Sequence, residues 1–154
     1  MLYTVGETAK ILGVAPSTLR YYDKEGLLPF VERSNGGMRV FQEKDFTWLY
    51  LVECLKRSGL SIKEIRHYLE LTRRGDATIG ERLEMLQKQR ERVRKQMEEL
   101  QNTLSTLDYK CWYYETAQKA GTTAVPQGMS LEEIPEEFRP AKEALERVRE
   151  RKRG

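Results

Sequence analysis

The residues best suited to chemistry lie between positions 16 and 25, in a segment that starts with proline and precedes a glycine. Polar side chains recur there at spacings of three and four, which places them on one face of a helix. That face carries hydroxyl, guanidinium and ammonium groups, which donate hydrogen bonds to phosphate oxygens. It therefore suits a nucleic-acid backbone, as the recognition helix of a helix-turn-helix does. The face consists of Ser17, Arg20, Tyr21 and Lys24.

A first helix is expected just before this segment. Thr4 and Glu7 have the spacing of a capping box, in which each side chain satisfies a backbone amide at the start of a helix. The helix should begin near Val5. Gly13 should end it, because glycine readily adopts the left-handed conformation that follows a helix.

The second helix has recognisable ends and an apolar face. Pro16 suits the first helical position, with Ala15 as a weak N-cap, and Gly26 should end the helix. Leu19 and Tyr22 lie on the face opposite the polar one and should point into a core.

A hairpin is expected after the second helix. Residues 29–33 and 38–41 are short runs of alternating apolar and polar side chains that flank Ser34-Asn35-Gly36-Gly37. Asn-Gly favours a tight hairpin turn because both residues accept positive φ. Arg33 and Arg39 would project from this wing beside the recognition helix. The helix pair and the hairpin together predict a winged helix-turn-helix that binds DNA.

From Glu43 the sequence is helical in character to about residue 120. Residues 44–57 are rich enough in apolar side chains to form a central core helix. Ser61 and Glu64 repeat the capping-box spacing, so another helix should start there. The apolar positions of the two helices are Phe46, Trp48, Leu49, Leu51, Val52 and Leu55, then Ile62, Ile65, Tyr68 and Leu69.

A long helix should follow the break at Gly75-Asp76. Apolar residues recur in it every 3.5 residues over five heptads, which is the pattern of a coiled-coil seam. A stripe on the order of 60 Å long has no counterpart in this chain, so it should pair with a second copy. Arg90 interrupts the stripe, either paired with a carboxylate of the partner or extended to solvent. The seam comprises Ile79, Leu83, Leu86, Arg90, Val93, Met97, Leu100, Leu104, Leu107, Cys111 and Tyr114.

Composition restricts the function further. The 154 residues include 33% charged side chains, and the net charge of +3 is only weak support for a nucleic-acid partner. No apolar run approaches 18 residues and no signal-like segment opens the chain, so a cytoplasmic protein without membrane contact is expected. Two cysteines without paired spacing suit a reducing compartment.

Enzymatic and metal functions lack support. The sequence has no phosphate-binding loop, metal cluster or acid–base pair, so we expect no enzymatic activity, no cofactor and no metal. Two cysteines and a single His67 cannot form a three-cysteine or Cys₂His₂ site within one chain. Two symmetry-related Cys111 residues binding a soft ion remain an alternative. Catalysis by Cys54 as a nucleophile is a weaker one.

Residues 2–71 resemble the N-terminal domain of the MerR family of bacterial transcription regulators. The resemblance rests on the string R-Y-Y-D-x-x-G-L from Arg20 to Leu27, and on the glycine-x-arginine of the wing, Gly37 and Arg39. Met38 stands where the family usually has an aromatic residue. Arg39 keeps the phosphate contact that the resemblance implies.

The resemblance implies an all-α fold with a small β wing. A winged helix-turn-helix domain at 1–75 would precede a long dimerisation helix at 76–121. Residues 122–154 would form a linker and a short helical tail. The tail would either pack on the dimer or remain loose with its basic end near DNA. That basic end comprises Arg149, Arg151, Lys152 and Arg153.

In the MerR family the long helices pair antiparallel, and the homodimer binds promoter DNA between two promoter elements. The protein distorts the duplex and so acts on RNA polymerase indirectly. A solvated surface explains the charges of Lys56 and Lys63 as well as backbone contact does. The expected DNA-binding residues are Thr4, Ser17, Thr18, Arg20, Tyr21, Lys24, Arg33, Gly37, Arg39, Lys56 and Lys63.

Two segments resemble the AdhR/NmlR branch of the family, which responds to reactive aldehydes and related electrophiles. They are E-C-L-K around Cys54 and the run from Asp108 to Ala117. The resemblance implies that Cys54 is the sensor. The neighbouring cations Lys56 and Arg57 favour its reactive thiolate. A small buried hydrophobe is the alternative for Cys54, and Cys111 on the seam is expected to pack.

Two other functions share the winged fold. One is a MerR-type regulator with a different small-molecule inducer or none. The other is an architectural DNA-binding protein of the excisionase type, which usually lacks a long dimerising helix. The seam therefore favours a regulator.

Overall fold

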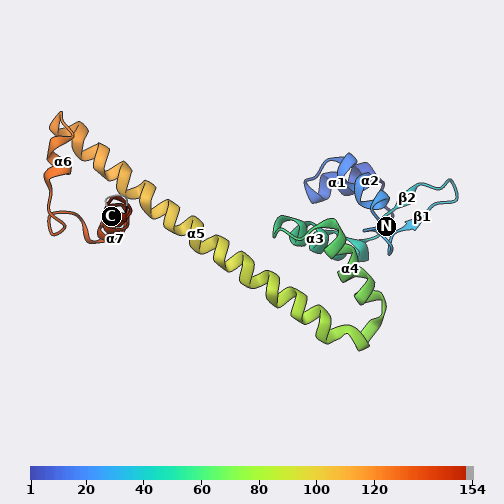
Figure 1. Ribbon diagram of the computed structural model, residues 1–154. Helices are drawn as coiled ribbons and strands as arrows, with labels where there is room; N and C mark the ends of the chain where they lie inside the picture. Colours follow the sequence, from blue (N-terminus) through green and yellow to red (C-terminus); the bar gives the residue numbers. More distant parts are fainter. Residues whose placement is uncertain (152–154) are drawn as a thin grey trace. The chain divides into compact units, whose positions relative to one another are not determined.

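The computed structural model describes residues 1–151 and contains two compact units, residues 1–91 and residues from 92 onward. The first unit begins with α1 (Val5–Leu12) and α2 (Pro16–Lys24), drawn in blue in Figure 1. Thr4 and Glu7 form the predicted capping box, with the Thr4 amide donating to Glu7 Oε2 at 2.8 Å. Gly13, at φ 68°, follows α1 as predicted.

The wing consists of β1 (Glu32–Arg33) and β2 (Arg39–Val40), which pair antiparallel with Arg33 opposite Arg39. The hairpin was predicted correctly, but its turn was not. Gly37, at φ 77°, has the positive φ that we expected at Asn35 and Gly36. The Gly37 amide donates to the Ser34 carbonyl at 2.8 Å, and the Ser34 amide donates to the Met38 carbonyl at 2.8 Å. These bonds form a longer loop that ends in a left-handed glycine.

The segment before α1 pairs with the residue that follows β2, a contact that the sequence did not indicate. Tyr3 and Phe41 exchange two backbone hydrogen bonds, of 2.8 and 2.9 Å. The Tyr3 ring also meets the Phe46 ring edge to face at 5.1 Å. The chain start is thereby tied both to the base of the wing and to the next helix.

The core of the first unit lies between α3 (Glu43–Arg57), α4 (Ile62–Arg73) and the N-terminal helices. Leu49, Val52 and Ile65 are almost completely buried, as predicted. Each buried aliphatic side chain of this size contributes about 1.5–3 kcal/mol. The buried members are Ala9, Leu19, Tyr22, Leu27, Leu28, Val31, Phe41, Leu49, Val52, Leu55, Leu60, Ile65, Tyr68 and Leu69.

The long helix α5 (Ile79–Ala120) has 42 residues and follows a 3-10 turn, η1 (Gly75–Thr78). The predicted long helix is thus confirmed. Its first turns belong to the first unit, because Met85 and Leu86 pack against the core. Gln89 is 5% exposed and donates a side-chain hydrogen bond to the Ser58 carbonyl at the end of α3.

The second unit contains the end of α5, the short helix α6 (Ala124–Gly128), a 3-10 turn η2 (Glu136–Phe138) and α7 (Arg139–Arg151). Helix α6 replaces much of the predicted linker. The tail packs on the end of α5: Ile134 and Ala141 are buried with Tyr109. The Trp112 and Phe138 rings lie 5.7 Å apart. The basic end of the tail continues into Lys152 and Arg153, which lie outside the described residues.

A pair of isoleucines tests where the core lies. Ile65 is fully buried, whereas Ile11 is 57% exposed. Ile65→Ala should lower the free energy of unfolding by about 2–5 kcal/mol, because it removes packed methyl groups and leaves a cavity. Ile11→Ala should change it by less than about 0.5 kcal/mol. Urea unfolding followed by circular dichroism measures both; equal losses would contradict this placement of the core.

Candidate nucleic-acid interface

Helix α2 presents one face to the core and the other to solvent. Leu19 and Tyr22 are 1% and 0% exposed. The polar residues of the opposite face are all exposed: Ser17, Arg20, Tyr21 and Lys24. Thr18, which was also predicted to contact DNA, is half-buried between the two faces. The helix therefore combines an apolar attachment with a free surface of donors, as a recognition helix requires.

Tyr22 fixes the inner face of α2 to α3. Its hydroxyl donates a hydrogen bond to Glu53 Oε1. The ammonium of Lys56 lies 5.1 Å from the centre of the Tyr22 ring. Burial and the hydrogen bond to Glu53 raise the pKa of Tyr22 above its ordinary value, so the hydroxyl stays protonated and remains a donor.

The end of α2 is held by α4. Arg66 Nε donates to the carbonyl of Glu25 at 2.8 Å, and its Nη2 lies 3.2 Å from Glu25 Oε2. Sequence reasoning missed this pair, because the two residues lie 41 positions apart and neither belongs to a local pattern. The contact orients the last turn of α2 relative to the second helix pair.

The wing arginines do not project freely. Both pair with Asp23 on α2: Arg39 Nε donates to Asp23 Oδ1 at 2.7 Å, and Arg33 Nη2 donates to Asp23 Oδ2 at 3.0 Å. Arg39 also donates to the Val31 carbonyl. A phosphate contact by Arg39 stays a prediction, whereas in this structure its guanidinium is bound within the protein. Asp23 belongs to the R-Y-Y-D-x-x-G-L string, but its bonds to the wing could not be predicted from that string.

Three other predicted DNA-binding residues lie at different places in the first unit. Thr4 caps α1 through its hydroxyl. Lys63 is exposed in the first turn of α4. Lys56 is exposed on α3 and lies over the Tyr22 ring. Gly37, at the end of the wing loop, has room beyond its Cα but a positive φ that disfavours any side chain.

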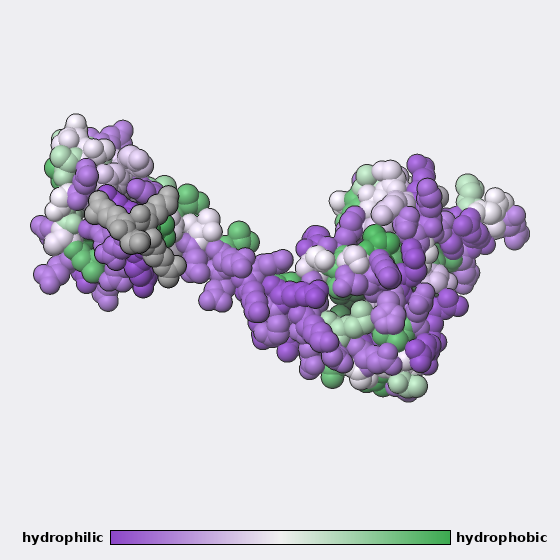
Figure 2. Space-filling view, in the orientation of Figure 1, coloured by the Kyte–Doolittle hydropathy of each residue, from purple (hydrophilic) through white to green (hydrophobic). Residues whose placement is uncertain are grey.

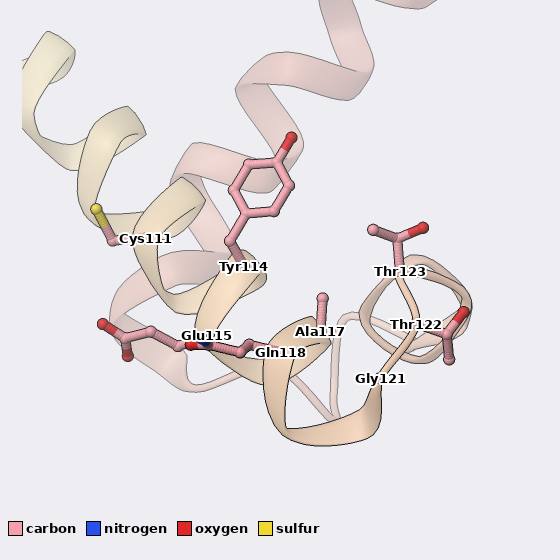
Figure 3. Close-up of a pocket in the computed structure, with 8 residues that line it drawn as sticks. All are labelled: Cys111, Tyr114, Glu115, Ala117, Gln118, Gly121, Thr122 and Thr123. Carbon is pink, nitrogen blue, oxygen red and sulfur yellow. The ribbon is translucent and has the colours of Figure 1, made fainter.

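The two cysteines lie in different units and both are exposed. Cys54 lies on α3 immediately after Glu53, and its carbonyl accepts the Ser58 amide at 2.9 Å. Its exposure excludes the buried-hydrophobe alternative within a single protomer. Cys111 lies one turn before Glu115 on α5 (Figure 3), where it lines an open pocket of about 710 Å³ with Tyr114.

Large apolar side chains remain exposed along α5. Figure 2 shows that the visible face of this helix is mainly hydrophilic, so its apolar side chains do not surround it. Leu86 and Val93 are half-buried, and Arg90 is exposed beside Glu91 at 3.8 Å. The exposed seam residues are Ile79, Leu83, Met97, Leu100, Leu104, Leu107, Cys111 and Tyr114.

The described residues contain neither a metal-binding cluster nor a membrane-spanning helix. Residues 1–151 contain no cluster of three or more histidine, cysteine, aspartate or glutamate side chains able to hold a metal ion. Within the same range no helix has the length and apolar character needed to span a membrane.

The fold and the exposed face of α2 define a winged helix-turn-helix DNA-binding protein. Two family models match the sequence: "MerR HTH family regulatory protein" over residues 3–72 and "MerR, DNA binding" over residues 46–109. An uncharacterized HTH-type transcriptional regulator of Haemophilus influenzae is 43% identical over 136 residues, which cover 88% of this chain and 98% of that protein.

Two further relatives belong to one branch of the MerR family. The HTH-type transcriptional regulator AdhR of Bacillus subtilis is 36% identical over 89 residues, 58% of this chain and 64% of AdhR. HiNmlR, a MerR family regulator lacking the sensor domain and solved bound to promoter DNA, shares 41% identity at a TM-score of 0.78. The match covers 88% of this chain and 100% of HiNmlR. The chain belongs to the MerR family of DNA-binding transcription regulators, in its NmlR/AdhR-like branch, and these relatives are regulators rather than enzymes.

Adjacent tyrosines on α2 test the inner attachment. Tyr22→Phe removes the donor to Glu53 and should lower the free energy of unfolding by about 1–3 kcal/mol, because the half-buried carboxylate loses its partner. Tyr21→Phe is the matched control: its ring is 44% exposed, so its stability should change by less than about 0.5 kcal/mol. Guanidinium unfolding of both variants is the measurement, and wild-type stability of Tyr22→Phe would contradict the role of this bond.

Proposed function

We propose that this protein regulates transcription as a homodimer that binds an inverted repeat in promoter DNA, and that Cys54 responds to an electrophile. The observation that carries the proposal is the free polar face of α2. Arg20 and Lys24 face solvent, while Tyr22 anchors the opposite side of the same helix. HiNmlR supports the assignment, because it adopts a similar fold and was solved on promoter DNA.

The DNA contacts follow from this geometry. Helix α2 enters the major groove, where Arg20 and Lys24 reach base edges and phosphates. Ser17, Thr18 and Tyr21 donate to the backbone of the same groove. The wing lies over the adjacent phosphates, where Arg33 donates to a phosphate oxygen. Thr4, Gly37, Lys56 and Lys63 are candidates for further backbone contacts, and Arg39 supports the wing.

The homodimer rests on the exposed apolar side chains of α5. Leu100 and Leu104 are 69% and 50% exposed on a helix whose other faces carry mostly charged residues. Each leucine covered by a partner contributes about 1.5–3 kcal/mol, and the seam repeats over five heptads. The family implies antiparallel pairing of the two helices. Two identical reading units related by a two-fold axis require an inverted repeat.

Control of transcription then acts through the DNA. Bending a binding site of about 20–30 base pairs costs on the order of 1–6 kcal/mol, which added protein–DNA contacts offset. A dimer that changes the shape of the duplex alters the access of RNA polymerase to the promoter without binding the polymerase. The activating signal must therefore change how the dimer holds the DNA.

Cys54 is the candidate receiver of that signal. Its exposure allows a small solute to reach the sulfur. HiNmlR is described as lacking the sensor domain, and this chain matches all of it, so we assign sensing to a single residue of the DNA-binding unit rather than to a separate sensor domain. With an aldehyde, the thiolate adds to the carbonyl carbon, and the oxygen takes a proton from water to give a hemithioacetal. No oxidant is needed, and the step is reversible.

Substitution of Arg20 tests the recognition face. Arg20→Ala should weaken binding to a duplex selected from a random pool by about 5- to 150-fold, because a direct Arg contact to a base or phosphate is worth about 1–3 kcal/mol. Lys88→Ala, an exposed cation on α5, is the matched control and should bind like the wild type. Fluorescence anisotropy at a fixed salt concentration measures both. An Arg20→Ala affinity equal to that of the control would refute the assignment.

Substitution of Cys54 tests the sensor. Cys54→Ala should keep full affinity for the promoter but lose induction by formaldehyde in a reporter strain, because no thiol remains to form the adduct. Cys111→Ala removes the other cysteine, which lies on the proposed seam, and should induce normally. Normal induction of Cys54→Ala would remove the sensor assignment while leaving the DNA-binding proposal intact.

A further inference from the structure

The wing brings two like charges into direct opposition. Arg33 on β1 and Arg39 on β2 are register partners in the hairpin. Like charges directly opposite each other destabilise an antiparallel pair. Each strand has only two residues, and an isolated two-stranded hairpin is at best marginally stable. Another element must therefore hold the wing in place.

Tyr3 holds the base of the wing through Phe41, and Asp23 on α2 holds the two strands. Its two carboxylate oxygens bind one arginine from each strand: Oδ1 accepts from Arg39 Nε at 2.7 Å, and Oδ2 accepts from Arg33 Nη2 at 3.0 Å. The hydrogen bond from Arg39 is the main cause that lowers the pKa of Asp23. A carboxylate in the last turn of a helix is unfavourable for the helix itself, because that end carries partial negative charge. The position of Asp23 is therefore explained by its contacts with the wing.

Both guanidinium groups also bind the backbone of the wing region. Arg33 Nη1 donates to the Gly37 carbonyl at 2.9 Å, which secures the wing loop. Arg39 Nη1 donates to the Val31 carbonyl, which secures the segment entering β1. One carboxylate on α2 thus binds two arginines that in turn contact the wing loop and the segment entering β1.

The two arginines differ in accessibility. The Arg39 side chain is 20% exposed and uses its Nε and both Nη atoms inside the protein. The Arg33 side chain is 55% exposed and makes one bond to Asp23. Releasing Arg39 would leave the Asp23 carboxylate and the Val31 carbonyl without their donor. Releasing Arg33 returns a guanidinium to solvent at little cost, and phosphate is a strong alternative acceptor for it.

We propose that Asp23 is a positioning residue for DNA binding: Arg39 permanently fixes the wing to α2 through it, while Arg33 exchanges it for a DNA phosphate. The inference rests on the proposed DNA-binding function. It places a carboxylate in the DNA-reading unit as a requirement for affinity, although negative charge near a duplex normally opposes binding.

The sign of one substitution distinguishes positioning from simple electrostatics. Asp23→Asn removes a negative charge beside DNA, so it would tighten binding if Asp23 only competed for the arginines. If Asp23 positions the wing, the same change should weaken binding to the duplex selected with the wild type by about tenfold, the scale of one charge-assisted hydrogen bond. Asp76→Asn removes an exposed carboxylate elsewhere in the unit and should bind unchanged or slightly tighter.

Two further measurements test the separate roles of Arg39 and Arg33. Arg39→Gln should weaken binding about as much as Asp23→Asn, and the double variant should be no more than about twofold weaker than Arg39→Gln, because both disrupt one contact. Arg33→Gln should reduce the slope of log affinity against log salt by about 0.9, the value for one phosphate. The proposal would be overturned if the double variant lost affinity by the product of the two single losses. Tighter binding by Asp23→Asn, or an unchanged salt slope for Arg33→Gln, would also overturn it.

Hydrogen exchange of the free protein separates this inference from the proposed function. The Ser34 amide, bonded across the wing to Met38, should exchange about tenfold faster in Asp23→Asn and Arg39→Gln but not in Asp76→Asn. Faster exchange without any DNA binding by the wild type would disprove the function and keep the wing contact. Unchanged exchange would disprove the contact itself.

Discussion

The first unit depends on how a nine-residue helix is held while one of its faces stays free. A helix as short as α2 is not stable alone in water, so its orientation must come from tertiary contacts. Two positions in its last turn and the C-cap residue that follows it supply side-chain contacts to three partners. Tyr22 reaches α3, Asp23 reaches the wing and Glu25 is bound by Arg66 of α4. The exposed face of α2 is therefore free because the opposite side is fully engaged.

This arrangement explains the balance between stability and function in the wing. DNA binding favours arginines on both strands, yet two arginines in register repel each other. A carboxylate supplied by the recognition helix offsets that repulsion and links the wing to the helix. The same contact keeps Arg33 near the surface, where we propose that a DNA phosphate competes with Asp23 for it.

Local patterns predicted most of the fold of the first unit. The capping boxes at Thr4 and Ser61 involve residues three positions apart, so the sequence alone revealed them. The period of three and four placed Leu19 inside and Arg20 outside. The seam of α5 was readable for the same reason, because a heptad pattern is visible without any partner.

The missed contacts that join α2 to helices α3 and α4 are nonlocal. Arg66 and Glu25, like Tyr22 and Glu53, lie more than 30 positions apart, and no spacing rule links them. The turn of the wing was misjudged because two consecutive glycines offered alternative positions for the positive φ, and hydrogen bonds to Ser34 selected the second. The phosphate contact expected of Arg39 came from the family resemblance; no local pattern revealed its hydrogen bond to Asp23, because Asp23 belongs to another element.

The proposed seam contacts, inverted repeat and distortion of DNA all require that two chains pair on one duplex. Sedimentation equilibrium of the protein with a duplex selected from a random pool measures it directly. We expect two chains per duplex, an inverted repeat in the selected sequence, and much weaker binding once one half-site is scrambled. A single chain per duplex that binds the scrambled site equally well would contradict the proposed dimer.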